Sequence, residues 1–481
     1  MTDIKNKALK SALRTKDKEY MHTDLPLSNN ENKKMAKIAG QESAMTHYRF
    51  GPFITFNISF KKYRIDNGVP IIKTKKRVIS LANHHDSFIY RYYGSLLTDY
   101  YDKYVSIAGI SECAAAYRRN QGKSNITTAK DVFDFIFDTG DTWVFKGDFS
   151  SFFDNLDHGY LKRMVKNVLG ESRLPIDWYR VINSITKYRL IPKDELIDAL
   201  KLHRKYVTYR NTYGMAYFKN RKELGQYIKT NKIPISSANK VGIPQGTAIS
   251  AVLANVYMIK FDEYVQNNMN NLNGMYRRYS DDFIICIPKA SMTKAQIELF
   301  VDKIIDKSKN SLHLKIEKSK TKIYDYSKND KNLFMLIGDE KKVSILSYLG
   351  FTFDGRVVAI RPKSIYKFIY KSKRNVKSLK NAESVWNSLD GKMDIHNNHS
   401  SLATVVRKDF NNKHRFTVKK RIIRGYLSIP QKVNPRMSML SYADSVQRIM
   451  SIGGKYKVVA RHQVTKQIRY NQKEVFKKRI R

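Results

Sequence analysis

The sequence predicts an α+β protein in which a small antiparallel sheet has helices behind it and a basic helical region follows. An apolar run over residues 142–148 predicts one strand. Aromatic and β-branched residues over 275–287, interrupted by Ser280-Asp281-Asp282, predict a strand–turn–strand hairpin. Small apolar residues over 251–258 follow a Gly/Pro loop and have helical length and spacing.

Carboxylates stand at the end of the first strand, Asp148, and at the tip of the hairpin, Asp281 and Asp282. If the two strands are neighbours in one sheet, these side chains meet in space. Clustered carboxylates repel one another unless a cation offsets them, and their hard oxygens select Mg²⁺ or Mn²⁺. Two such ions are a known device for phosphoryl transfer. An Asp-rich hairpin turn without any chemistry is the alternative interpretation of the hairpin alone.

Three segments in this order resemble motifs A, B and C of reverse transcriptases, in the style of the bacterial branch that contains group II intron, retron and abortive-infection or defence-associated enzymes. The segments are Asp148 with Phe152-Phe153-Asp154-Asn155, Gly242-Ile243-Pro244-Gln245-Gly246 with Ser250 and Asn255, and Tyr279-Ser280-Asp281-Asp282. The resemblance covers about residues 70–375. It implies a right-hand polymerase, with fingers and an antiparallel palm sheet followed by a helical, basic thumb.

The resemblance also implies a division of the chain. We expect a polar N-terminal extension over 1–45, fingers over 46–140 and a palm over 141–360. The palm would contain an inserted segment at about 173–240, and a basic helical thumb with a C-terminal extension would cover 361–481. Little periodicity is visible before residue 45, so that extension is expected to be flexible or to fold on a partner.

The resemblance assigns roles to the acidic residues and their neighbours. Asp148, Asp281 and Asp282 would bind two Mg²⁺ ions, or Mn²⁺, with the backbone of Phe149 as a further ligand. A bulky ring at Phe153 would clash with a 2′-hydroxyl and so favour deoxynucleotides. Gln245 and Gly246 would lie near the template and the nascent base pair.

Basic residues complete the expected site. Arg118, Arg119 and Lys123 resemble the second fingers motif, where guanidinium forks hold a triphosphate; a solvated basic loop is the alternative. Lys318, with Lys320 as second choice, resembles the motif D lysine that gives a proton to pyrophosphate. The stretch Ser347–Phe353 resembles the primer grip.

Composition limits the partners. A net charge of +46 and a pI of about 10 favour nucleic acid as partner. No apolar run approaches the length of a transmembrane helix, so no membrane association and a cytoplasmic location are expected. Cys113 and Cys286 give neither a disulfide framework nor a zinc site.

The resulting hypothesis is an RNA-directed DNA polymerase that uses dNTPs and an RNA template, here a dedicated non-coding RNA in bacterial antiviral defence, and makes DNA. The chain lacks the second cysteine pair of zinc endonuclease domains and the Asn-Ala-x-x-His and Val-Thr-Gly signatures of typical retron enzymes, which favours the defence type. Two alternatives stay open: a template-independent or protein-primed DNA nucleotidyltransferase, and an RNA-binding protein with a vestigial site. A homo-oligomer is left open.

Overall fold

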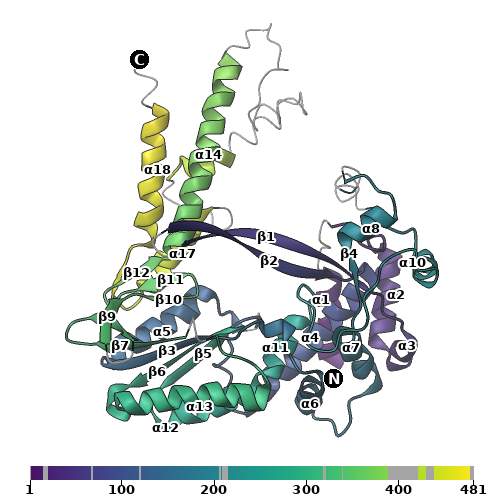
Figure 1. Cartoon of the computed structure of the whole chain (residues 1–481), viewed down its shortest axis with the longest axis horizontal. Coiled ribbons are helices and arrows are strands. Elements are labelled where there is room, and N and C mark those ends of the chain that lie inside the picture. The colour runs from purple at the N-terminus through teal and green to yellow at the C-terminus, as the bar shows by residue number, and fades with distance from the viewer. Residues whose placement is uncertain are drawn as a thin grey trace.

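The computed structural model describes residues 2–14, 20–66, 69–118, 121–204, 207, 215–317, 321–337, 340–387, 421–429 and 438–476. It confirms the α+β class. Figure 1 shows a central sheet, a helical region beside it, a long β-hairpin reaching from that region towards the other side, and two helices rising near the C-terminus.

The central sheet has six strands in the order β5-β6-β3-β7-β8-β9, all antiparallel. Their bounds are β3 Thr142–Asp148, β5 Met275–Tyr279, β6 Asp282–Pro288, β7 Lys322–Ser327, β8 Asn332–Ile337 and β9 Glu340–Ser344. The strand and hairpin expected from the sequence are therefore present. Because the side chains of a strand alternate between the two faces of a sheet, β6 contributes side chains to the hydrophobic core on each face of this sheet.

Helices cover both faces of the central sheet, which explains the continuous apolar runs in β3 and β6. Phe283 and Ile285 pack in one core with α12 (Ile259–Asn271) and α13 (Lys294–Leu312). Ile284 packs in a second core with α5 (Asn125–Thr139). The helix expected at 251–258 is α11 (Ser250–Tyr257).

The helical region surrounds α4 (His84–Ile107), whose tyrosines Tyr90, Tyr92, Tyr93 and Tyr101 are buried in the core. Helices α6 (His158–Leu169), α7 (Ile176–Thr186) and α11 contact α4. Short 3₁₀ turns lie at Phe152–Asp154 and Lys289–Ser291.

The N-terminal extension differs from the expectation of a flexible segment. It forms α1 (Thr2–Arg14), α2 (Asn29–Gly40) and α3 (Glu42–His47), and α1 and α2 contact α4. A few small or unbranched apolar residues provide the contact surface, and they are buried: Ala8, Ala12, Met35, Ala39 and Met45. Because only a narrow face of each helix is apolar and many Lys and Asn residues surround it, the sequence of this segment shows little helical periodicity.

A second sheet has three strands in the order β2-β1-β4. It joins residues that were expected in the fingers to residues that were expected in the inserted segment of the palm. Strands β1 (Phe53–Asp66) and β2 (Val69–Leu81) form the long hairpin of Figure 1, and β4 (Leu190–Pro192) pairs in parallel with the base of β1. Helices α8 (Lys193–Ala199) and α10 (Arg221–Lys229) pack in the same small core. The segment at 173–240 is therefore divided: α7 packs in the helical region, whereas β4, α8 and α10 pack against the base of the hairpin.

The C-terminal sheet has the strand order β10-β11-β12-β13. Its bounds are β10 Leu346–Tyr348, β11 Phe351–Phe353, β12 Val357–Ile360 and β13 Lys457–Val458. Helices α14 (Pro362–Asn387) and α18 (Ala460–Phe476) rise from it side by side, with α17 (Met439–Met450) at their base. Residues 390–401, where the sequence around Asn397 and Asn398 favours a loop, lie outside the described residues. Among the described helices, none is long and apolar enough to cross a membrane.

Candidate active site

The register of the central sheet brings the three acidic residues together. Asp148, the last residue of β3, lies directly opposite Asp282, the first residue of β6. The backbone N–H of Phe149 donates to the carbonyl of Asp281 at 3.1 Å. Asp148 is 8% exposed, whereas the Asp282 side chain is 41% exposed. Opposite residues of an antiparallel pair share one face, so carboxylates converge at one end of the sheet, where hard cations find oxygen ligands.

Gly147 is required by the packing beneath this site. It lies opposite Phe283, and a Cβ at Gly147 would overlap the Phe283 ring. That ring is held by Phe145, Phe149 and Phe261, with ring centroids 5.6, 5.3 and 6.0 Å away. The aromatic cluster therefore fixes the ends of both acid-bearing strands from below.

A buried guanidinium supports the acidic turn, Tyr279–Asp282. Arg278 is fully buried and donates to both carboxylate oxygens of Asp262, at 2.9 and 2.7 Å. It also donates to the Ser280 carbonyl at 3.1 Å and to Asn255 at 3.2 Å. Burial alone would lower the pKa of Arg278, but Asp262 raises it above its usual value, so the guanidinium stays charged in the core. Ser280 itself has a left-handed φ of 62°.

Tyr117 approaches the same turn from the other side. Its hydroxyl lies 3.2 Å from Ser280 Oγ, as donor, while its ring is 47% exposed. Its φ of 65° is unusual for a bulky residue and stores backbone strain. Asn255 donates to the neighbouring carbonyl of Ala116 at 2.9 Å. The sequence reading missed Arg278, Asp262 and Tyr117; a charged residue at a buried position of the alternating β5 strand is the signal that identifies Arg278.

The Gly-Ile-Pro-Gln-Gly loop is tied to both neighbouring segments. The Ser80 N–H donates to the Gln245 carbonyl at 3.0 Å, and the Gln245 amide donates to Asp154 at 3.4 Å. Gly246 has φ 121°, and a Cβ there would lie 2.9 Å from the Ser80 carbonyl oxygen. The loop thus links the base of β2 to the turn after Asp148.

The two phenylalanines assigned to the site lie differently. The Phe149 ring is 1% exposed, so only its backbone is available as a ligand. Phe153 is half-buried on the 3₁₀ turn and stacks edge-on against Phe152, with ring centroids 5.4 Å apart. Phe153 is therefore the ring of this turn that has an accessible edge.

The structure does not support triphosphate binding by Arg118. This side chain is buried, donates to Asp102 at 2.7 Å and lies over the Tyr101 ring. Further bonds go to the backbone carbonyls of Ser111 and Ala114. A buried guanidinium requires partners of this kind, so the charge of Arg118 is offset by groups within the protein.

The remaining basic candidates are placed only in part. Lys123 is ion-paired with Glu112 and lies 3.8 Å from Asp131, with 20% of its side chain exposed. Arg119, Lys318 and Lys320 lie outside the described residues. The segment before Lys318 does reach the acids, since the Glu317 N–H donates to the Asp148 carbonyl at 2.8 Å.

Lys146 is a further cation beside the acids. Its Nζ donates to the Ser347 carbonyl on β10 at 2.9 Å and lies 4.0 Å from Asp282 Oδ1. Burial lowers the pKa of Lys146, and the neighbouring carboxylates of Asp282 and Asp148 oppose that shift.

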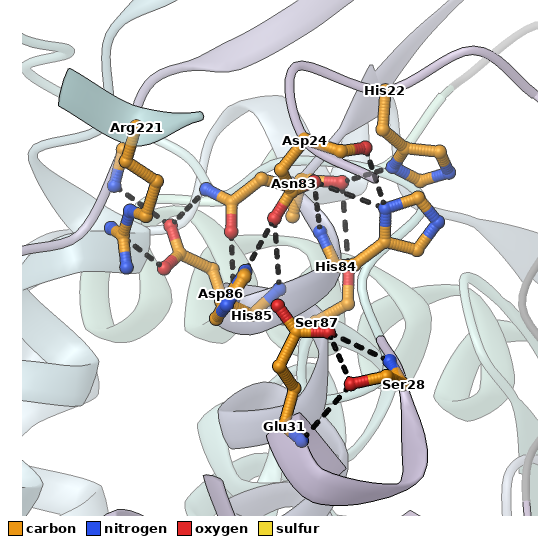
Figure 2. A network of polar contacts seen from close by, with 12 residues as sticks. His22, Asp24, Ser28, Glu31, Asn83, His84, His85, Asp86, Ser87 and Arg221 are labelled. Atoms are coloured by element: carbon orange, nitrogen blue, oxygen red, sulfur yellow. Dashed lines mark hydrogen bonds and ion pairs between the residues drawn. The ribbon is translucent and has the colours of Figure 1, made fainter. Parts of the chain in front are cut away.

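A second polar cluster lies at the start of α4 (Figure 2). His22, Asp24 and His84 are buried, and one potential metal-ligand atom from each lies within 4.8 Å of the others. Asp24 accepts bonds from the backbone N–H of His84 at 2.8 Å and of His85 at 3.3 Å. Both imidazoles also contact it, at 3.0 and 2.7 Å. The cluster thus connects the N-terminal segment to the start of α4 by hydrogen bonds. The positive end of the helix dipole at that position favours a carboxylate.

A second carboxylate, Asp86, extends this hydrogen-bond network. It accepts from the Tyr48 hydroxyl at 2.6 Å, from the Gly51 N–H at 2.8 Å and from the Asn83 amide at 2.7 Å, and lies 3.5 Å from Arg221 of α10. Figure 2 shows Asp24, which comes from the segment before α2, facing the start of α4, and Asp86 in the first turn of that helix. The network joins four segments of the chain and lies on α4, not on the central sheet.

Comparisons with known proteins give the family. The model of the family described as "Reverse transcriptase (RNA-dependent DNA polymerase)" matches residues 73–353. No curated protein matches.

Among solved structures, apo telomerase from Candida tropicalis truncated from its C-terminal domain is 10% identical, with TM-score 0.38, over 62% of this chain and 55% of that one. Telomerase from Candida albicans in complex with a telomeric RNA fragment is also 10% identical, with TM-score 0.38, over 90% of this chain and 62% of that one. The chain thus spans roughly half to three-fifths of these telomerase chains. Because the family model spans more than half of the chain and includes all three acidic residues, the chain belongs to the reverse transcriptase family.

Proposed function

We propose that this protein is an RNA-directed DNA polymerase that adds deoxynucleotides to a primer 3′-hydroxyl. One observation carries the proposal: Asp148 and Asp282 lie opposite each other at one end of an antiparallel sheet, and Asp281 lies in the adjoining turn, bonded through its backbone to Phe149. The family match over the same residues supports it. Position is most of this catalysis, and a misplacement of about 1 Å can cost two orders of magnitude in rate.

The acids fit divalent cations because the donor set is hard oxygen at a partly exposed sheet end. We assign Asp148, Asp281 and Asp282, with the Phe149 backbone, to two Mg²⁺ ions, for which Mn²⁺ can substitute. When bound, such ions lower the pKa of the primer hydroxyl and offset charge on the leaving pyrophosphate. The chain itself holds the acids in place through Arg278 and the aromatic cluster.

Substrate selection is assigned to residues around the acids. The accessible edge of Phe153 would exclude a 2′-hydroxyl, and Gln245 with Gly246 would face the template and the new base pair. Lys123 is retained for the triphosphate, because its side chain is partly exposed. Arg119 and Lys318 keep their roles, triphosphate contact and proton donation, on the resemblance alone.

The proposed division of the chain is the one that the family resemblance implies. We assign 46–140 to the fingers, 141–360 to the palm and 361–481 to the thumb and C-terminal extension. The extension over 1–45 packs on α4, and the part of the inserted segment from β4 to α10 packs on the hairpin.

Asp281→Asn tests the activity. It should abolish dNTP incorporation on an RNA template with a DNA primer while the melting temperature stays near that of the wild type. Asp302→Asn, an exposed carboxylate on α13, is the matched control and should retain activity. Synthesis by Asp281→Asn near the wild-type rate would refute the site.

The template is proposed to be a dedicated non-coding RNA that serves bacterial antiviral defence. The support is the charge of +46, which is far more than a short primer–template duplex needs. Purification without nuclease, followed by sequencing of the bound RNA, tests this. A single enriched RNA is expected, and random cellular RNA would contradict the proposal.

Protein-primed or template-independent synthesis is the second candidate. Tyr366 and Tyr370 on α14 are 69% and 68% exposed and offer hydroxyls as primers. Supplying single dNTPs without template, and asking whether product enters the aqueous phase of a phenol extraction only after proteolysis, separates this candidate from the first.

A further inference from the structure

Lys146 connects three segments that the proposed reaction needs in a fixed arrangement. It lies on β3 two residues before Asp148, so both side chains project from the same face of the central sheet. Asp282 lies opposite Asp148 on that face. The Lys146 side chain is therefore directed along the sheet face that carries the acids.

The contacts of Lys146 are specific. Its Nζ donates to the backbone carbonyl of Ser347 at 2.9 Å and lies 4.0 Å from Asp282 Oδ1. Only 22% of the side chain is exposed. A largely buried ammonium is costly unless partners hold it, so its position is determined by these two contacts.

Ser347 belongs to β10, which pairs with β11 at the edge of the C-terminal sheet. This strand pair leads through β12 into α14. The Lys146–Ser347 bond thus joins the sheet that carries the acids to the sheet that precedes the C-terminal helices.

We infer that Lys146 is a positioning residue for the primer strand: through the Ser347 carbonyl it fixes the β10–β11 pair at a set distance from the acids. The inference rests on the proposed function. Hydrogen bonds from a charged donor are shorter and stronger than neutral ones, so this bond can hold one strand end in a single position. The ammonium also offsets part of the charge on Asp282, so one side chain approaches both the acidic turn and the β10–β11 pair.

Three variants separate this role from a general one. Lys146→Met keeps the length of the side chain but removes the charge and the donor, and Lys146→Arg keeps both. Lys322→Met is the control, because Lys322 lies directly opposite Lys146 on β7 and is exposed.

The first measurement needs no synthesis. Anisotropy with an RNA–DNA duplex that has a recessed 3′ end should show about tenfold weaker binding by Lys146→Met, equivalent to about 1.4 kcal/mol. The Arg variant should restore most of the affinity, and a blunt duplex should bind all variants alike. Equal binding of the recessed duplex by wild type and Lys146→Met would overturn the inference.

The second measurement is steady-state synthesis. Lys146→Met should raise the KM for primer–template and lower kcat by about ten- to a hundredfold, as expected for a misplaced terminus, with little change in the KM for dNTP. Equal losses in every constant together with a lower melting temperature would show a merely structural role and contradict the inference. If the wild type itself makes no DNA on RNA, the proposed function fails, and the binding measurement still decides the role of Lys146.

Discussion

Removal of Arg278 should destabilise the protein more than removal of any exposed arginine. Both Arg278 and its partner Asp262 are 0% exposed, and the guanidinium also bonds Asn255 and the Ser280 carbonyl. Arg278→Met leaves the Asp262 carboxylate in the core with the Tyr276 hydroxyl, at 2.7 Å, as a donor. Breaking one partner of a buried pair costs about 3–5 kcal/mol, because the remaining charge is uncompensated.

Urea denaturation followed by tryptophan fluorescence measures this loss as a shift in midpoint at constant slope. In Arg278→Met/Asp262→Leu neither charge of this pair remains in the core, so the double variant should recover at least about 2 kcal/mol relative to Arg278→Met. Arg461→Met is the control: its pair with Asp444 is 45% exposed on the arginine side and should cost no more than about 1 kcal/mol. If Arg278→Met costs no more than this control, the reasoning about the turn is wrong.

Three further outcomes are expected. Gly147→Ala should cost about 1–3 kcal/mol in urea denaturation and abolish synthesis, because the added methyl group overlaps the Phe283 ring; unchanged values would contradict the packing argument. Tyr117→Phe should slow synthesis about fivefold, the equivalent of about 1 kcal/mol, without lowering the melting temperature, since only a hydroxyl bond to the acidic turn is lost. Burial alone would raise the pKa of Asp24, but bonds from the His84 and His85 imidazoles hold it well below its usual value. The stabilisation that the ionised Asp24 gives to the fold is therefore complete above about pH 4 and is lost as the pH falls below that value. Melting temperatures recorded between about pH 2 and 6 should show this loss in the wild type but not in Asp24→Asn.

The central sheet was predictable because each of its key strands is apolar throughout or alternates, and because its turn interrupts that pattern. The run 142–148 corresponds to β3, and the hairpin at 275–287 corresponds to β5 and β6. Pairing of Asp148 with the hairpin followed from the resemblance and from the chemistry of clustered acids. Local pattern and chemistry agree at this point, which is where sequence reasoning is strongest.

Long-range contacts account for what was missed. Strand β13 has two residues and pairs with β12 about a hundred positions earlier, so no local pattern identifies it. Helices α1 and α2 become recognisable only when α4 is present to cover Ala8 and Met35. Arg118 looked like an open basic residue, because its partner Asp102 is on the preceding helix and their contact depends on the tertiary fold.

Two kinds of carboxylate lie close together in this protein, and their difference has a consequence for binding. The charge of Asp262 is offset inside the core by Arg278, whereas Asp282 is 41% exposed at the end of the sheet, with the Lys146 ammonium 4.0 Å away. A chain with a net charge of +46 attracts a polyanion over much of its surface, but an acidic set repels the phosphates that approach it. Monovalent salt weakens the general attraction, whereas a divalent cation on the acids removes a local repulsion. Affinity for a recessed 3′ end should therefore rise with Mg²⁺ at constant ionic strength, and that rise should disappear in Asp281→Asn while the dependence on monovalent salt remains.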